Sequence, residues 1–214
     1  MPDAAPHSQA PRLDGRGLSC VRDDRVLFTG LDFGLGTGEA LLIEGRNGTG
    51  KTTLLRAICG IRRAEEGEIL WSGESIERLG PDYHRHVAYV GHNDGVKREL
   101  TVEENLRMAC ALGTEGALSI TEALRRVHLA GFEDVVASNL SAGQRRRLAL
   151  ARLLVTDSLL WVLDEPFTSL DRHGIGVVED LMQAHVAGGG MLVMTSHHEV
   201  AMHRTAIHRI DLSA

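Results

Sequence analysis

A glycine-rich segment between an apolar run and a helix-like run limits the folds open to this chain more than any other feature. Residues 45–52 read GRNGTGKT and match the pattern GxxxxGK[ST]. The apolar run 39–44 predicts a buried strand, and 51–59 predicts a helix with Gly60 as its C-cap. A strand, a glycine loop and a helix N-terminus in this order are typical of phosphate binding. The alternative is a chance glycine-rich turn, which would not require a strand before it and a helix after it.

The loop supplies the first candidate site residues. Its glycines let successive backbone N–H groups turn toward the α- and β-phosphates of a nucleotide. Lys51, one of only two lysines among 23 cationic residues, can reach the β- and γ-phosphates, and the Thr52 hydroxyl can ligate Mg²⁺. We expect nucleotide contacts from Gly45, Arg46, Asn47, Gly48, Thr49, Gly50, Lys51, Thr52 and Thr53.

Strand-like runs alternate with helix-like runs along most of the remaining chain. Strands are expected at 68–71, 86–90, 159–163, 191–195 and 207–212, and helices at 171–186 and, in shorter form, after Thr195. Residues 18–33 differ, because their short apolar runs at 25–28 and 31–33 predict antiparallel strands. The alternation predicts an α/β fold with a largely parallel sheet.

A helical lobe is predicted between two of these strands, over about residues 93–155. Thr101 with Glu104 and Ser119 with Glu122 fit capping boxes that open helices, and 144–155 is a third helical run. We expect residues 1–12 to be a disordered tail and residues 13–214 to form a single domain that contains this lobe.

Composition excludes several classes of protein. The net charge of −6 argues against a general nucleic-acid binder, and we expect no nucleic-acid partner. Three widely spaced cysteines without a CxxC pair indicate a reducing compartment and no thiolate zinc site. The first 17 residues lack the apolar core of a secretory signal, and the apolar runs are far shorter than the ~18 residues of a membrane span.

Two carboxylates follow the most apolar strand-like run. Asp164, at the carboxyl end of this run, is expected to face the phosphates and hold Mg²⁺ directly or through water. Glu165 is placed to orient or deprotonate an attacking water molecule. An apolar strand that ends in Asp-Glu is commonly just a strand meeting solvent, but that alternative weakens once a phosphate loop is present.

Residues 140–144, LSAGQ, open another helix and carry a resemblance to a known family. Together with the loop and the carboxylates they resemble the ATP-binding cassette family, whose signature LSGGQ is changed here only by Ala142. The resemblance implies an ATPase with a RecA-like P-loop NTPase core, an antiparallel β subdomain and an inserted helical signature subdomain. It also implies that Ser141, Gly143 and Gln144 close over ATP bound to the second subunit of a head-to-tail homodimer; the alternative is an ordinary helix cap by Ser141.

The same resemblance assigns further positions. His197 after the strand ending at Thr195 is similar to the switch histidine that contacts the γ-phosphate, and 169–171 to a loop that touches the partner's site, although Asp171 could simply cap a helix. His92 stands where a Mg²⁺-sensing glutamine is usual, or in a generic surface loop. Arg22 either stacks on adenine or is a solvated arginine.

One branch of the family fits best. The stretch 91–101, GHNDGVKRELT, with LSAGQ, resembles the ATP-binding subunits of haem exporters in cytochrome c biogenesis. This implies an ATP-driven, haem-transporting translocase that is peripheral on the cytoplasmic face of the bacterial inner membrane, with integral membrane subunits of the cytochrome c maturation complex as partners. A subunit for another exported or imported substrate, or a soluble ATP switch, remains open.

Two stretches outside the site motifs carry further expectations. The polar loop 92–101 between strand and lobe is expected to move with the nucleotide and to press on a membrane subunit through Val96 and Lys97. The basic run Arg145–Arg147 is expected to be a solvated helix face.

Overall fold

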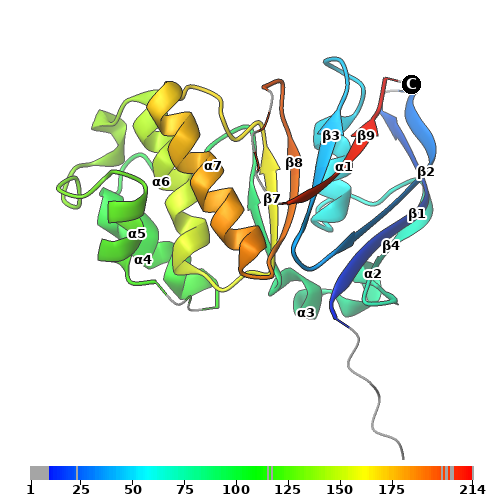
Figure 1. Cartoon of the computed structure of the whole chain (residues 1–214), viewed down its shortest axis with the longest axis horizontal. Helices are drawn as coiled ribbons and strands as arrows, with labels where there is room; N and C mark the ends of the chain where they lie inside the picture. The colour runs from blue at the N-terminus through cyan, green and yellow to red at the C-terminus, as the bar shows by residue number, and fades with distance from the viewer. Residues whose placement is uncertain are drawn as a thin grey trace, which may run out of the picture.

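The computed structural model describes residues 10–22, 24–114, 116, 118–198, 200, 202 and 205–213. Two sheets and several helices make up this part of the chain, and the helices within residues 102–187 gather at one end of the molecule (Figure 1). The first nine residues of the expected tail 1–12 lie outside the described residues, and the first strand begins at Arg12.

The N-terminal sheet is antiparallel, in the order β2-β1-β4-β5. Its strands are β1 (Arg12–Arg22), β2 (Arg25–Gly36), β4 (Glu66–Trp71) and β5 (Glu74–Ser75). The two short strands expected at 25–28 and 31–33 are parts of the single strand β2. Register shifts in the β1–β2 ladder bend this pair, as bulges do in antiparallel sheets.

The second sheet is parallel, in the order β6-β7-β8-β3-β9. Its strands are β3 (Glu39–Glu44), β6 (Val87–Val90), β7 (Leu160–Asp164), β8 (Met191–Thr195) and β9 (Ala206–Asp211). Every residue of β7 and β8 is buried, because parallel strands are covered on both faces. Asp164 pairs with Thr195, so the carboxyl ends of β7 and β8 meet.

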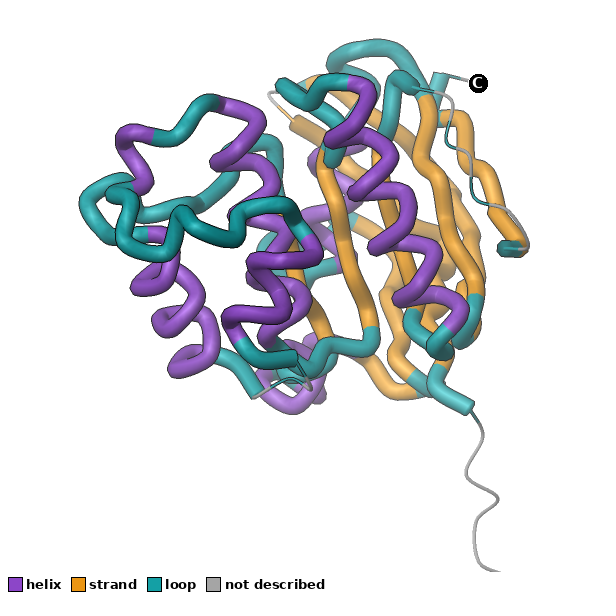
Figure 2. Tube along the Cα trace, turned by 60° about the vertical axis from the view of Figure 1, so that its left-hand side comes forward, coloured by secondary structure: helices purple, strands orange, loops and turns teal. Residues whose placement is uncertain are grey.

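The alternating side chains of the parallel sheet divide the core in two. Leu41 of β3 and Val162 of β7 face a cluster shared with the antiparallel sheet and α1 (Lys51–Ile58). Leu42 and Leu163 face the opposite cluster, which includes α7 (Arg172–Ala187) and the helical lobe. Figure 2 shows α7 running along this second face of the sheet. The glycine loop is therefore held by packing on both sides of β3.

The helical lobe lies between β6 and β7 in the chain. It comprises α4 (Val102–Leu112), α5 (Ile120–Arg126), the 3₁₀ turn η1 (Ala137–Asn139) and α6 (Ala142–Val155). Thr101 and Glu104 make both hydrogen bonds of the predicted capping box. At the second predicted box, the Ser119 hydroxyl accepts from Glu122 N–H. Two one-turn helices, α2 (Ile76–Leu79) and α3 (Pro81–His84), precede β6.

Two further observations complete the fold. The short helix predicted after β8 falls in a segment of which residues 199, 201, 203 and 204 lie outside the described residues. No helix in the described ranges is both long and apolar enough to cross a lipid bilayer.

Candidate functional site

The glycine loop turns back on itself at the carboxyl end of β3. Gly45 has φ of +139°, and a Cβ there would lie 2.8 Å from the Thr49 hydroxyl oxygen, so this position requires glycine. The Lys51 ammonium donates to the carbonyl oxygens of Gly45 at 2.6 Å and Arg46 at 3.2 Å. These bonds hold the buried ammonium inside the loop, where it can meet phosphate charge.

Asp164 is the centre of a buried hydrogen-bond network that joins three elements. Its Oδ2 accepts from the Thr52 hydroxyl of α1 at 2.8 Å, and its Oδ1 accepts from the Thr195 hydroxyl of β8 at 2.8 Å. Asp164 is 2% exposed, so the alternative of a strand that merely meets solvent is wrong. The network places the Thr52 hydroxyl and an Asp164 oxygen side by side, as the sequence predicted.

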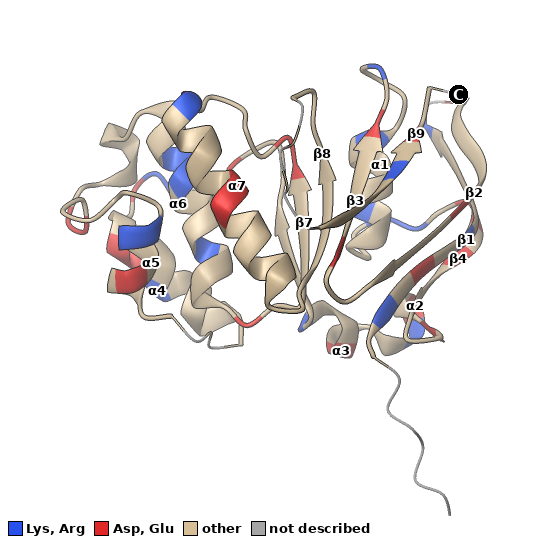
Figure 3. Ribbon diagram, viewed as in Figure 1, with Lys and Arg blue, Asp and Glu red and all other residues tan. Residues whose placement is uncertain are grey.

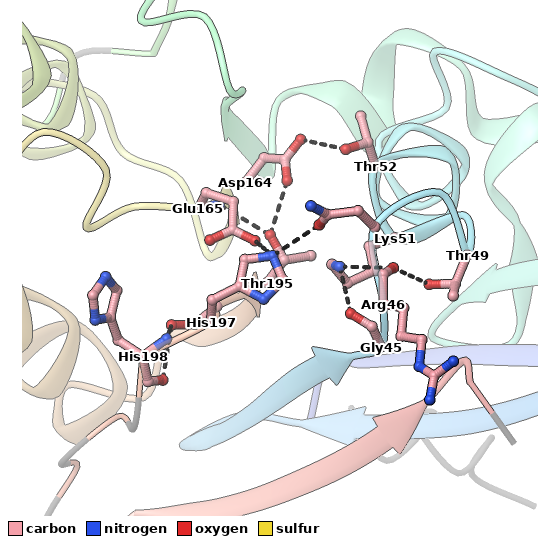
Figure 4. A network of polar contacts seen from close by, with 12 residues as sticks. Gly45, Arg46, Thr49, Lys51, Thr52, Asp164, Glu165, Thr195, His197 and His198 are labelled. Atoms are coloured by element: carbon pink, nitrogen blue, oxygen red, sulfur yellow. Dashed lines mark hydrogen bonds and ion pairs between the residues drawn. The ribbon is translucent and has the colours of Figure 1, made fainter.

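Glu165 directs its carboxylate toward the end of the loop. Its backbone φ of +51° is unusual for a residue with a side chain, and its N–H donates to Thr195 Oγ1 at 2.9 Å. Glu165 Oε1 lies 3.3 Å from His197 Nε2, and the same ring nitrogen lies 3.2 Å from Asn47 Oδ1. In Figure 4, His197 lies toward Glu165 and the loop, while the ring of His198 points away.

These groups line one cavity of about 410 Å³, large enough for part of a nucleotide. The cavity is lined by Arg22, Leu27, Asn47, Gly48, Gly50, Lys51, Thr52, Thr53, His92, Asp164, Glu165, Thr168 and His197. The structure thus brings together every predicted catalytic and metal-binding residue. His92 and Arg22 share the cavity with the carboxylates, although the sequence had left both open as surface residues.

Other predicted contacts lie outside this cavity. Gly45 is absent from its lining, and Arg46 and Thr49 line a neighbouring hollow beside Ser213. Ser141, Gly143 and Gln144 lie at the start of α6 and do not line the cavity either. Ser141 is exposed to solvent.

The start of α6 is a complete capping box. Ser141 Oγ accepts from Gln144 N–H at 3.2 Å, and Gln144 Oε1 accepts from Ser141 N–H at 2.8 Å. The cap and a phosphate contact are compatible, because a hydroxyl oxygen that accepts a bond still has its own proton to donate. Asp171 similarly caps α7 by accepting from Gly174 N–H at 2.7 Å.

Two residues that bond to Asp164 and Glu165 escaped the sequence analysis. Thr195 has no exposed surface and bonds to both, and its place opposite Asp164 is visible only in the register of the folded sheet. Arg146 is 4% exposed, which corrects the prediction that the run Arg145–Arg147 is a solvated face. Burial lowers the pKa of Arg146, against the opposing effect of nearby Asp164.

The backbone of the loop 92–101 is hydrogen-bonded to the lobe, whereas its movement with the nucleotide stays a prediction. Asn105 accepts from Lys97 N–H at 2.8 Å and donates to the carbonyl oxygens of Lys97 and Thr101. Arg152 donates to the carbonyl oxygens of Asp94 and Gly95. Val96 is buried in the lobe core, whereas Lys97 is exposed.

Charged residues are unevenly distributed around the cavity. Acidic residues lie at the carboxyl end of β7, and basic residues lie along α6 (Figure 3). Within the described ranges, no group of three or more His, Cys, Asp or Glu side chains could hold an ion. Thr52 Oγ1 and Asp164 Oδ2 lie 2.8 Å apart and could supply two oxygen ligands, which is the usual protein share for Mg²⁺ bound with phosphates and water.

The chain is similar to known proteins over most of its length. The family model described as "ABC transporter" matches residues 28–168. The chain is 46% identical over 208 residues to the cytochrome c biogenesis ATP-binding export protein CcmA of Photobacterium profundum, covering 91% of this chain and 96% of that protein. It is 50% identical over 193 residues to CcmA of Methylococcus capsulatus, covering 89% and 93%.

A solved structure supports the fold. The dimeric bacterial ABC transporter cassette MJ0796 superposes with a TM-score of 0.80 at 21% identity, covering 94% of each chain. The α/β P-loop NTPase fold predicted from the sequence is confirmed by this likeness and by the two sheets described above. With a family model that spans most of its length and relatives near 50% identity, the chain belongs to the ABC transporter family.

Proposed function

We propose that the chain is the ATP-hydrolysing subunit of an ABC transporter for haem export in c-type cytochrome biogenesis. One observation carries the ATPase part most directly. Thr52 and Asp164, 112 residues apart in sequence, share a 2.8 Å hydrogen bond inside the cavity that also contains Lys51 and Glu165. A phosphate loop, an oxygen-ligand pair and a carboxylate for water are the parts that phosphoryl transfer to water requires.

Each residue has a role in this proposal. The N–H groups of the loop 45–53 and the Lys51 ammonium bind the phosphates, and Thr52 and Asp164 hold Mg²⁺, with His92 reaching it through water. The metal neutralises charge on the phosphates. Glu165 accepts a proton from the attacking water. His197, which Asn47 and Glu165 flank, donates to the γ-phosphate.

A homodimer completes the site. The cavity is open on one side, and the residues Ser141, Gly143 and Gln144 lie outside it at the exposed start of α6. In a head-to-tail dimer this segment of one subunit covers the γ-phosphate held by the other. The solved cassette MJ0796, which is dimeric and shares the fold, supports such a pairing.

The cargo and location rest on the names of the relatives. Both CcmA proteins are export proteins of cytochrome c biogenesis, and they align with nearly the whole chain. We propose that the chain lies on the cytoplasmic face of the inner membrane, bound to integral membrane subunits. A soluble ATP switch is the alternative, and co-purification separates the two: membrane proteins support transport, whereas ribosomes or DNA support the switch.

The ATPase assignment is tested by Glu165→Gln. The amide cannot accept a proton, so turnover should fall on the order of 10²–10⁴-fold while ATP binding persists. Lys51→Ala should abolish ATP binding, and Glu74→Gln on the exposed β5 is the matched control. Near-normal hydrolysis by Glu165→Gln would overturn the role given to this carboxylate. Failure of the wild-type chain to restore cytochrome c maturation in cells lacking their own subunit would overturn the cargo.

A further inference from the structure

Arg146 joins the start of α6 to the backbone of the catalytic centre. Its guanidinium donates to four carbonyl oxygens: Gly91 at 2.7 Å, Asp164 at 2.7 Å, Glu165 at 2.8 Å and Pro166 at 3.2 Å. The acceptors belong to two segments, one just before His92 and the other containing both site carboxylates. A planar fork with five donors can span two segments in this way, whereas the single nitrogen of lysine cannot.

Burying this cation is expensive, so its partners indicate what the arrangement achieves. Arg146 is 4% exposed, and burial lowers its pKa. Its hydrogen bonds go to main-chain oxygens rather than to a carboxylate, so the contacts fix backbone position instead of neutralising charge.

The Glu165 peptide is held from both sides. Thr195 Oγ1 accepts from its N–H, and Arg146 donates to its carbonyl oxygen. Between these bonds Glu165 keeps a left-handed φ of +51°, a conformation that persists only when surrounding contacts favour it. The side-chain direction of Glu165 toward His197 depends on this backbone conformation.

A second contact fixes α6 against the same segment. A Cβ on Gly143 would lie 2.8 Å from the carbonyl oxygen of Ser169, so the first turn of α6 packs directly on the chain that follows Glu165. Packing at Gly143 and hydrogen bonding at Arg146 lie one turn apart on α6. Together they join the helix to residues 164–169 as one body.

We propose that Arg146 is a positioning residue that holds the Glu165 backbone in its hydrolytic conformation and makes it move together with the first turn of α6. This inference rests on the proposed ATPase function. Arg146 acts through Glu165, so its loss should impair turnover rather than nucleotide binding.

The test is a double-mutant cycle between Arg146→Lys and Glu165→Gln in the full chain. In the wild-type background, Arg146→Lys should lower kcat on the order of 10–100-fold with KM changed less than about two-fold, the size expected for a misplaced catalytic group. In the Glu165→Gln background the same change should lower residual single-turnover rates less than about two-fold, because the residue it positions is gone.

Arg152→Lys is the matched control. Arg152 is a half-buried α6 arginine that also donates to main-chain carbonyl oxygens, in this case those of Asp94 and Gly95. Arg152→Lys should keep kcat within about two-fold of wild type while losing about as much thermal stability as Arg146→Lys. If Arg146→Lys melts below the assay temperature, the cycle is run with Arg146→Gln, which keeps one donor pair.

The outcomes separate the inference from the function it rests on. Equal rate loss from Arg146→Lys in both Glu165 backgrounds, or a rate loss no larger than that of Arg152→Lys, would overturn the positioning role. A rise in KM with unchanged kcat would also overturn it. A wild-type chain without ATPase activity would instead overturn the proposed function.

Discussion

The hydroxyl of Thr195 serves both site carboxylate residues, because it donates to Asp164 and accepts from Glu165 N–H. Thr195→Val has nearly the same shape but leaves a buried oxygen and a buried N–H without partners. We expect the free energy of unfolding to fall by about 1–3 kcal/mol, as for other unsatisfied buried polar groups. Urea unfolding measures this, and Thr195→Ser, which keeps the hydroxyl, should lose much less. Equal stability of the valine and wild-type chains would contradict the network.

At the scale of residues, the motif residues that share the cavity could be predicted from the sequence. The buried polar residues that bond to them could not. Lys51, Thr52 and the Asp164–Glu165 pair belong to patterns typical of phosphate chemistry, and the structure brings these residues into one cavity. Arg146 and Thr195 lacked such a signal. Three consecutive arginines point in three directions around a helix, and the sequence alone does not say which one faces the core.

On α7, His185 gives stability a pH dependence. Its ring stacks on Trp161 at 3.9 Å, and burial lowers its pKa to about 4, against weaker hydrogen bonds to backbone carbonyls such as that of Met191. An unfolded histidine titrates near 6.5, so the unfolded state binds more protons between these values. Stability should therefore fall as pH drops from about 6.5 to 4, and no further from this group below pH 4.

Phenylalanine at this position should remove that pH dependence. In the wild-type chain the free energy of unfolding should fall on the order of 1–3 kcal/mol between pH 6.5 and 4. His185→Phe keeps a ring stacked on Trp161 but cannot take up a proton, so this fall should be absent. The measurement is denaturant unfolding across this range. His86→Phe is the control, because His86 also stacks on a tryptophan, Trp71, but is exposed. Parallel curves for His185→Phe and wild type would contradict the assignment.

The loop before α4 calls for a narrower test than the sequence suggested. A joint change of Val96 and Lys97 would disturb the lobe core, because Val96 is buried. Lys97→Ala alone should leave thermal stability and ATP binding unchanged. It should lower cytochrome c maturation at least several-fold if the exposed side chain contacts a membrane subunit. Arg98→Ala, on the neighbouring exposed position, is the control, and full maturation with Lys97→Ala would exclude the contact.

Elements with strong periodicity were predicted nearly to the residue, whereas the contacts of the loop 92–101 with the lobe were not. The strand 191–195 and the helix near 171–186 match β8 and α7 because burial and caps leave them few alternatives. The loop 92–101 looked mobile from its glycines and polar residues. Asn105, 1% exposed, holds it through contacts that become visible only once the chain has folded.

For the whole molecule, ATP should control association. The Glu165→Gln chain should form dimers with MgATP and remain monomeric with ADP, because ADP lacks the γ-phosphate that joins the two subunits. Light scattering at saturating nucleotide measures the mass directly. Ser141→Arg, which places bulk and charge on the exposed helix start, should abolish the dimer while leaving ATP binding intact. A monomer under all these conditions, even with membrane subunits present, would contradict the pairing.

The two lysine side chains should differ in their reactivity toward amine-specific reagents. Lys51 is buried with its ammonium held by carbonyl oxygens, whereas Lys97 stands exposed on a backbone that Asn105 fixes. Apart from the α-amine, an amine-reactive dye or crosslinker should therefore modify this chain at Lys97. A short crosslinker would join Lys97 to whatever protein covers the loop in the cell, without any engineered label, and mass spectrometry of the joined peptides would identify the covering protein directly.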